Sequence, residues 1–318
     1  MWRTTSRWLR RHSKGLSLLL MAGIFSLLGW QLLRDWHKLP PGFFRNVSLP
    51  TLLASLAALL PALLLVSMRW GLTLRTMNVP VEWGASIRIW FLSQAGRYIP
   101  GGVWTYVGRF YLGREEMPRE AMVTSMVLET ELRIVSEVLA FLLSLPFWSD
   151  TGFLNVENTF LLVGAVSMGL LFLHPAVLRR LSNTAPSKRI GLSPQDVSGL
   201  QYSRILLLLA YYVLSVILVG AAFYLLAAAF YPMPLQLLPP LMGSLALSVV
   251  LGFLMPLAPN GWGVREGVLA FLLSRLVPSP VAIVLSVVAR IWLGLGEGAW
   301  ILAMFLLHRG VKRGSPAE

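Results

Sequence analysis

Residues 96–104 read Gly96-Arg97-Tyr98-Ile99-Pro100-Gly101-Gly102-Val103-Trp104, a short break between two strongly apolar segments. A second break, Pro259-Asn260-Gly261-Trp262-Gly263-Val264-Arg265-Glu266, interrupts the apolar sequence about half a chain later. Backbone groups are not left unpaired in hydrocarbon, so such breaks occur in membrane proteins only where protein or a watery cavity surrounds them. Two breaks at corresponding positions are typical of transporters that are built from repeats.

The composition indicates an all-α polytopic membrane protein. Apolar residues make up 56% of the chain and charged residues only 13%, far from the values of an ordinary soluble domain. The net charge of +13 comes from Lys and Arg at the ends of apolar segments, where they set orientation and touch anionic lipid. We therefore predict no nucleic-acid partner. The absence of cysteine excludes disulfides, and the four scattered histidines show no metal-ligand spacing, so neither a metal nor a cofactor is predicted.

Six apolar segments are long enough to be predicted as full spans. They are Leu16–Leu33, Leu52–Met68, Ala121–Phe147, Phe160–Leu173, Ile205–Phe230 and Val281–Leu307. The basic leader before the first span and the basic tail after the last span place both termini in the cytoplasm. Between the second and third spans, Arg69, Arg75 and Arg88 mark a return to the cytoplasmic side.

The segments beside the two breaks predict re-entrant helical hairpins. Residues 87–95 hold too few apolar residues to cross a bilayer, so the first hairpin enters and leaves on the cytoplasmic side. Leu235–Leu257 and Val264–Leu276 flank the second break and form a hairpin from the outer side. An eight-span layout, in which the flanks of one or both breaks cross fully, satisfies the same pattern.

The order of span, span, hairpin and span occurs twice with opposite orientation, which predicts an inverted repeat. Pro100 and Pro259 lie 159 positions apart, and Arg133 and Arg290 lie 157 apart. We expect a single membrane domain in which residues 1–174 form the first repeat plus the fourth span. Residues 175–203 form a cytoplasmic linker, and residues 204–318 form the second repeat.

Charged residues inside the predicted spans require an explanation, because each costs about 3 kcal/mol at mid-bilayer. Glu129, Arg133 and Glu137 are spaced four apart on one helical face, and Arg290 and Glu297 share a face of the last span. One explanation is structural: the charges pair with one another, for Glu129, Arg133 and Glu137 along a single helix.

Basic residues exceed acidic ones around the breaks, which favours a site for an anion. Guanidinium groups beside Gly-rich turns with backbone N–H groups are typical of anion binding. The candidate substrate-binding residues are Arg97, Tyr98, Gly101, Trp104, Arg109, Glu129, Glu131, Arg133, Asn260, Gly261, Trp262, Arg265, Glu266, Arg290 and Glu297. Trp104 and Trp262 either line this site or wedge the turns. No catalytic motif is present, so no catalytic residue is predicted.

These residues resemble the transmembrane-region family of lysylphosphatidylglycerol synthases, which are flippase-like membrane proteins. The resemblance covers nearly the whole chain. It rests on Arg69-Trp70, on the break at 96–104 with Gly108-Arg109, on Gly261-Trp262-Gly263-Val264-Arg265-Glu266-Gly267, and on Arg290 and an acidic residue of the third span, Glu129 or Glu131. We expect no soluble aminoacyl-transferase part like that of full synthases, so the resemblance implies lipid translocation rather than synthesis.

We therefore expect a lipid flippase or transporter in a bacterial inner membrane, and not an enzyme. Its substrate would be an anionic lipid, either an aminoacyl phospholipid or a polyprenyl-phosphate-linked glycolipid. Its partners would be membrane lipids and a lipid-modifying synthase or glycosyltransferase. Two alternatives belong to other classes: an integral-membrane enzyme that acts on a lipid phosphate with Glu129 or Glu131 as base, and a non-transporting scaffold for a membrane glycosyltransferase.

Overall fold

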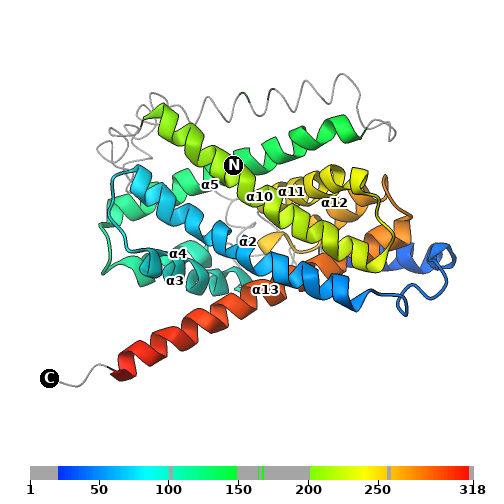
Figure 1. The fold of residues 1–318 in the computed structure, drawn as a ribbon, viewed down its shortest axis with the longest axis horizontal. Coiled ribbons are helices and arrows are strands. Elements are labelled where there is room, and N and C mark those ends of the chain that lie inside the picture. Colours follow the sequence, from blue (N-terminus) through cyan, green and yellow to red (C-terminus); the bar gives the residue numbers. More distant parts are fainter. Residues whose placement is uncertain are drawn as a thin grey trace, which may run out of the picture.

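The computed structural model describes residues 21–99, 103–148, 201–255 and 259–314, together with residues 164 and 167. Within these residues the regular structure is entirely helical (Figure 1). The elements are a helix over residues 21–34, η1 Trp36–Lys38, α2 Leu49–Thr76, α3 Trp83–Gln94, η2 Ala95–Tyr98, α4 Trp104–Gly113, α5 Arg119–Ser144, η3 Leu145–Phe147, α10 Tyr202–Phe230, η5 Leu235–Leu237, α11 Leu238–Leu254, η6 Pro259–Gly261, α12 Val264–Leu273 and α13 Ser279–Gly314. An all-α fold is thus present as predicted.

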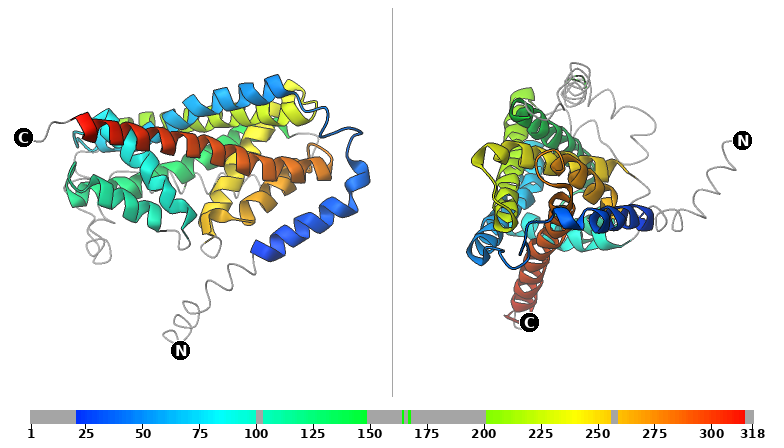
Figure 2. Two further views of the ribbon diagram at one scale, coloured as in Figure 1. Left: turned by 90° about the horizontal axis from the view of Figure 1, so that it is seen from below. Right: turned by 90° about the vertical axis from the view of Figure 1, so that its right-hand side faces the viewer.

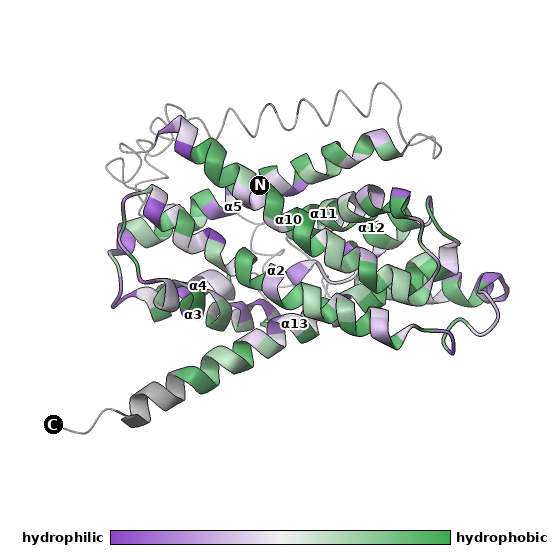
Figure 3. Ribbon diagram, viewed as in Figure 1, coloured by the Kyte–Doolittle hydropathy of each residue, from purple (hydrophilic) through white to green (hydrophobic). Residues whose placement is uncertain are grey.

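Within the described residues, four helical segments are long and apolar enough to cross a membrane: Leu49–Thr76, Tyr202–Phe230, Leu235–Leu254 and Ser279–Leu307. Three of them contain the predicted second, fifth and last spans. The described part of the first predicted span is helical, and the fourth predicted span lies outside the described residues. Figure 3 shows that apolar residues dominate α10 and α11. The protein is a multi-pass membrane protein.

The third predicted span, α5, is long but charged. Its 26 residues reach about 39 Å, enough to cross the hydrocarbon core. Because it carries several charged residues, α5 is not one of the four segments that are apolar enough to cross a membrane. Several of its polar side chains, including Ser125, Ser136 and Glu137, are buried against the rest of the protein rather than facing outward. Packing within the bundle therefore accounts for a helix that apolarity alone does not identify.

Both breaks join two helices that pack against each other, as the hairpins predict. In the first hairpin α3 has 12 residues and α4 has 10, so neither arm reaches across a core of about 30 Å. The second hairpin is asymmetric. Its arm α12 has 10 residues, but residues 235–254 are long enough to cross by themselves. The number of crossings stays a prediction.

Glycine allows both breaks to close tightly. A Cβ on Gly96 would lie 2.6 Å from the carbonyl carbon and oxygen of Trp104, so a side chain would push the two ends of the first break apart. In the second break Gly261 has φ +68°, and its Cβ would lie 2.8 Å from the Cα of Gly252. This position combines a left-handed backbone with close contact to α11, and glycine satisfies both.

The two halves of the chain interlock. The long helices α2 and α10 pack along each other at the centre, and each hairpin packs on the last long helix of the other half, α3 on α13 and α11 on α5. Figure 2 shows α13 running along the bundle, and in Figure 1 its C-terminal part extends beyond the other helices. Ile24, Leu28 and Leu32 of the first helix pack against Ala270 and Ile283.

The order of a long helix, a two-helix hairpin and a second long helix occurs twice among the described residues. Helices α4 and α12 have ten residues each and begin 160 positions apart. Helices α5 and α13 also begin 160 positions apart. Pro118 and Pro278 lie directly before α5 and α13, where proline suits a helix start. This recurrence fits the predicted repeat, whose inverted orientation stays a prediction, as do the domain boundaries.

Candidate functional site

The candidate site lies where the two breaks meet. The short helices η2 and η6, which belong to the first and second break, contact each other although they lie more than 150 positions apart. Helix α4 begins at Trp104 after the first break, and α12 begins at Val264 after the second. The second break has a left-handed backbone at Asn260, Gly261 and Gly263, with φ values of 52°, 68° and 82°. Tertiary packing therefore brings together two turns that the sequence separates.

Five charged residues gather around these breaks, and we call them the break cluster: Arg97, Arg265, Glu266, Arg290 and Glu297. The two carboxylates are almost completely buried, with 2% of Glu266 and 8% of Glu297 exposed. All four other members lie close enough to Arg265 to interact with it electrostatically. The break cluster therefore joins the first break, the start of α12 and the middle of α13.

Glu266 fixes the start of α12 and faces Arg290. Its Oε2 accepts a hydrogen bond of 2.6 Å from the backbone N–H of Gly263, which caps the helix. Its Oε1 lies 3.6 Å from Nε of Arg290 and accepts no hydrogen bond. Arg290 also donates to the carbonyl oxygen of Asn260 at 3.3 Å and lies over the Trp262 ring at 5.0 Å. Arg290 thus ties α13 to the second break.

Arg97 ties the first break to the same helix. Its Nη1 donates to Oε1 of Glu297 at 2.5 Å, and its Nη2 donates to Oε1 of Gln94 at 2.5 Å. The ion pair joins residues 200 positions apart and connects the two halves of the chain. Both terminal nitrogens of Arg97 are therefore engaged.

Arg265 differs from the other two arginines of the break cluster. Among the described residues it makes neither a hydrogen bond nor an ion pair within 4 Å. A Cβ added to Gly252 would lie 3.1 Å from the Cβ of Arg265, so Arg265 packs against the end of α11. Because three guanidiniums share two carboxylates, the break cluster carries one net positive charge. A half-buried excess charge of this kind favours an anion as its partner.

A second set of charges surrounds α5, and we call it the α5 cluster: Arg69, Arg109, Glu129, Arg133 and Glu137. Arg109 and Glu129 form an ion pair, and Trp90 donates to the other oxygen of Glu129 at 2.9 Å. Arg133 pairs with Glu137 at 3.3 Å and lies over the Phe253 ring at 5.1 Å. Glu129 therefore does not pair with Arg133 along the helix, as spacing alone had allowed, because Arg109 on α4 lies within reach.

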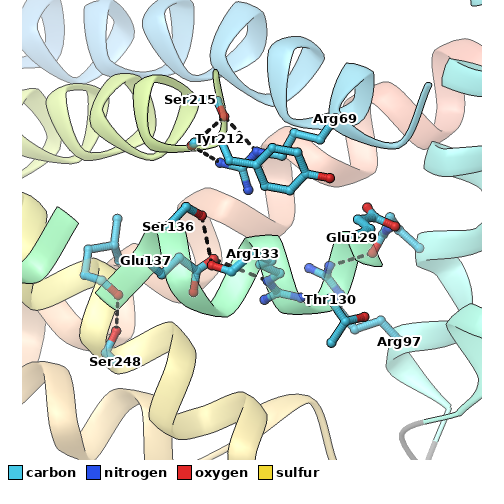
Figure 4. A network of polar contacts seen from close by, with 12 residues as sticks. Arg69, Arg97, Glu129, Thr130, Arg133, Ser136, Glu137, Tyr212, Ser215 and Ser248 are labelled. Carbon is cyan, nitrogen blue, oxygen red and sulfur yellow. Dashed lines mark hydrogen bonds and ion pairs between the residues drawn. The ribbon is translucent and has the colours of Figure 1, made fainter. Parts of the chain in front are cut away.

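Arg69 is the charged residue whose setting the sequence did not predict. It does not mark the end of a span but lies two turns inside α2, with 4% of the residue exposed. Its Nε donates to Ser215 at 2.7 Å and its Nη2 donates to the Tyr212 carbonyl oxygen at 3.0 Å, both on α10. Figure 4 shows it across from Arg133 and Glu137. The pair Arg69-Trp70 was a signal, because an arginine inside an apolar helix needs buried partners.

The predicted site residues thus separate into groups. The break cluster contains Arg97, Arg265, Glu266, Arg290 and Glu297, with Asn260, Gly261 and Trp262 on the adjoining break. Arg109, Glu129 and Arg133 belong to the α5 cluster. Glu131 lies on α5 with Oε2 buried and without a hydrogen bond, and Trp104 is 44% exposed at the start of α4. Gly101 and the side chain of Tyr98 lie outside the described residues.

A family model described as the transmembrane region of lysylphosphatidylglycerol synthase matches residues 15–294. This range includes both breaks, all of the α5 cluster, and the break cluster except Glu297. The chain belongs to this family. No curated protein and no solved structure matches it. Within this member of the lysylphosphatidylglycerol synthase transmembrane family, Glu297 lies three positions beyond the matched residues, although its side chain holds Arg97 of the first break.

Proposed function

We propose that the protein is a flippase that moves an anionic lipid between the two leaflets of a membrane. The observation that carries this proposal is the break cluster, in which three guanidiniums share two buried carboxylates and Arg265 makes no hydrogen bond or ion pair with any described residue. Membership of the lysylphosphatidylglycerol synthase transmembrane family supports a function that involves membrane lipids. Ionisable residues inside a membrane protein that face no structural partner are functional by default.

In this proposal the lipid headgroup enters at the two breaks. Arg265 engages the phosphate first, because binding there breaks no existing ion pair. The N-terminus of α12 adds the positive end of its helix dipole, and the backbone N–H groups near Gly261 donate to phosphate oxygens. The hydrocarbon tail stays in the bilayer. Arg109 and Glu129 hold the first hairpin against α5 and are not required to touch the lipid.

Movement would come from one half of the chain rocking against the other, as in transporters that are built from inverted repeats. The contacts between the two halves support this proposal, because each hairpin packs against the last long helix of the opposite half. The Arg97–Glu297 ion pair joins the halves at the site itself, so headgroup binding and movement are coupled there. The proposed location is the inner membrane of a bacterium with both termini in the cytoplasm.

Of the two candidate bases for an enzymatic role, Glu129 is not favoured by its surroundings. A general base must accept a proton, but both oxygens of this carboxylate are engaged, one by Arg109 and the other by Trp90. Glu131 has a buried Oε2 without a hydrogen bond among the described residues, so it is the candidate base of the enzymatic alternative. We propose a transporter that accepts its lipid from a lipid-modifying synthase or glycosyltransferase. In the alternative role, a scaffold for such an enzyme, the break cluster would serve only folding and association.

Lipid retention by the purified protein tests this proposal. Arg265→Ala removes a guanidinium without leaving a carboxylate unpaired, and Arg275→Ala is the control because that arginine is exposed just beyond α12. Mass spectrometry should show one class of anionic lipid enriched in the wild type and in Arg275→Ala. In Arg265→Ala the enrichment should fall about tenfold or more, as expected for the loss of a charge-assisted hydrogen bond.

A labelled phosphatidylglycerol in proteoliposomes then measures transfer between leaflets. The wild type should accelerate transfer and Arg265→Ala should not. Retention of bulk membrane lipids in unchanged proportions by all three proteins would contradict the anion site and favour the scaffold.

A further inference from the structure

The break cluster offers an incoming anion an unequal set of guanidiniums. Arg97 is held at both terminal nitrogens by Glu297 and Gln94. Arg290 is held by Glu266 and by the carbonyl of Asn260. Arg265 alone makes no direct contact of this kind among the described residues. The site therefore presents one available guanidinium.

The two carboxylates of the break cluster have different tasks. Glu266 caps α12 through the Gly263 N–H, so its position follows from the local fold. Glu297 lies in the interior of α13, away from any helix end, and its contact with Arg97 reaches across the two halves. Its negative charge offsets a guanidinium that otherwise belongs to the first break. Without Glu297 the same site would present two available guanidiniums and a net charge of +2.

We propose that Glu297 determines the charge class of the transported lipid. With Glu297 ionised, the break cluster accepts a headgroup with one negative charge, such as a phosphodiester. A phosphomonoester with two charges brings a second charge that Arg97 does not meet and that the Glu297 carboxylate repels. This inference rests on the proposed function, because it assigns selectivity to the same anion site.

A matched residue on α5 separates this role from burial alone. Glu137 lies 160 positions before Glu297 and is equally buried, with 7% exposed against 8%. It pairs with Arg133 four residues earlier on its own helix at 3.3 Å, and no hydrogen bond or ion pair joins it to a described residue of the first break. Loss of the Glu137 charge therefore leaves Arg97 engaged. Both residues have the same chemistry and burial, but only Glu297 controls a guanidinium of the break cluster.

The test is a competition between lipids of known charge. The full chain is incubated at pH 8 in micelles that contain equal amounts of phosphatidylglycerol, phosphatidic acid and phosphatidylcholine, and the bound lipids are quantified by mass spectrometry. At this pH phosphatidic acid is doubly charged, because the second pKa of a phosphomonoester is about 6. The wild type and Glu137→Gln should retain phosphatidylglycerol over phosphatidic acid. Glu297→Gln should shift this ratio toward phosphatidic acid by about tenfold, as expected for one added charge-assisted contact.

Two further variants identify Arg97 as the group that Glu297 controls. Arg97→Gln combined with Glu297→Gln removes the released guanidinium and should return the ratio to that of the wild type. Arg97→Gln alone removes the ion pair between the two breaks while the Glu297 charge remains, and should shift the ratio further toward phosphatidylglycerol. Because each ratio is measured within one preparation, it does not depend on yield. The double variant removes both members of the ion pair together, so it keeps the comparison open when a single variant folds poorly.

The outcomes distinguish this inference from the proposed function. Enrichment of neither anionic lipid over phosphatidylcholine by the wild type would overturn the proposed function and the selectivity together. Enrichment of anionic lipid with the same ratio in Glu297→Gln as in the wild type would overturn the role of Glu297 and leave the anion site standing. An equal shift in Glu137→Gln would also overturn it, because burial of a carboxylate anywhere in the bundle would then explain the effect.

Discussion

At the scale of single residues, the protein stabilises charges inside an apolar bundle by pairing them between helices. Arg109 is 3% exposed and its pairing with Glu129 joins α4 to α5, while Trp70 lies under the guanidinium at 4.9 Å. Such a buried pair adds little over a well-packed apolar pair, but removal of one partner leaves a charge without compensation. The cost of a substitution therefore depends on whether both partners change.

The Arg109–Glu129 pair makes this dependence measurable. Arg109→Met should lower the free energy of unfolding by about 3 to 5 kcal/mol, because the largely buried Glu129 carboxylate loses its ion pair and keeps only the hydrogen bond from Trp90. Arg109→Met combined with Glu129→Gln should cost clearly less than the single change. Thermal and denaturant unfolding in detergent measure both. As a control, Arg114→Ala disrupts an exposed pair with Glu115 and should cost roughly 0 to 1 kcal/mol. A single and a double variant of equal stability would show that the buried pair is not coupled.

At the scale of elements, each break depends on close backbone contact. The first break folds back so that Gly96 meets the backbone of Trp104, and Gly261 of the second meets Gly252. These contacts aim the starts of α4 and α12 at the site. Gly108, inside α4, has no such task, because a Cβ there would lie 3.7 Å from its nearest neighbour, the Cα of Ser93. Gly96 and Gly108 should therefore respond differently to alanine.

Gly96→Ala should destabilise the first hairpin, because a Cβ would lie 2.6 Å from a backbone that must then move. Gly108→Ala in the same hairpin should be neutral or stabilise the protein by about 0.5 to 1 kcal/mol, since alanine is the better helix former. Thermal unfolding and limited proteolysis at the hairpin compare the two variants. Equal behaviour would mean that the first break tolerates a side chain and does not require this close approach.

At the scale of the whole molecule, the predicted inverted repeat places equivalent loops of the two halves on opposite sides of the membrane. The loop before α5 contains Glu115, and the loop before α13 contains Arg275, 160 positions later. Both residues are exposed, and each loop follows a ten-residue helix that begins at a break. An inverted repeat places these loops on opposite sides of the membrane, while a parallel repeat places them on the same side.

The absence of cysteine makes the chain suited to test this orientation. In intact cells, Arg275→Cys should react almost completely with a maleimide that does not cross membranes. Glu115→Cys should remain almost unlabelled until the cells are opened, because the first hairpin enters from the cytoplasm. Labelling after cell lysis is the control for accessibility of both positions. Equal labelling of the two in intact cells would refute the inverted arrangement and the rocking motion built on it.

The sequence by itself determined the helical membrane fold and the location of its breaks. Apolar segments of spanning length specify helices, and Gly, Pro and Trp at 96–104 and 259–266 end them, because both signals act over a few neighbouring residues. The prediction of an apolar segment beginning at Val264 coincides with the start of α12, and the predicted end at Phe230 coincides with the end of α10. The excess of arginine beside the breaks was also visible at this level.

The spacing on α5 predicted the pair of Arg133 and Glu137, which is present, but only the tertiary structure decided which charges pair between helices. Spacing on a helix allowed Glu129 to pair with Arg133 and placed Glu297 near Arg290, but the structure pairs them with Arg109 and Arg97, which come from other helices. Arg69 likewise finds its partners on α10. A buried charge binds the nearest complementary group in space, and that group is set by how the helices pack rather than by separation along the chain. For this reason the guanidinium of Arg265, which in the break cluster makes no hydrogen bond or ion pair with a described residue, could be recognised only from the packed helices.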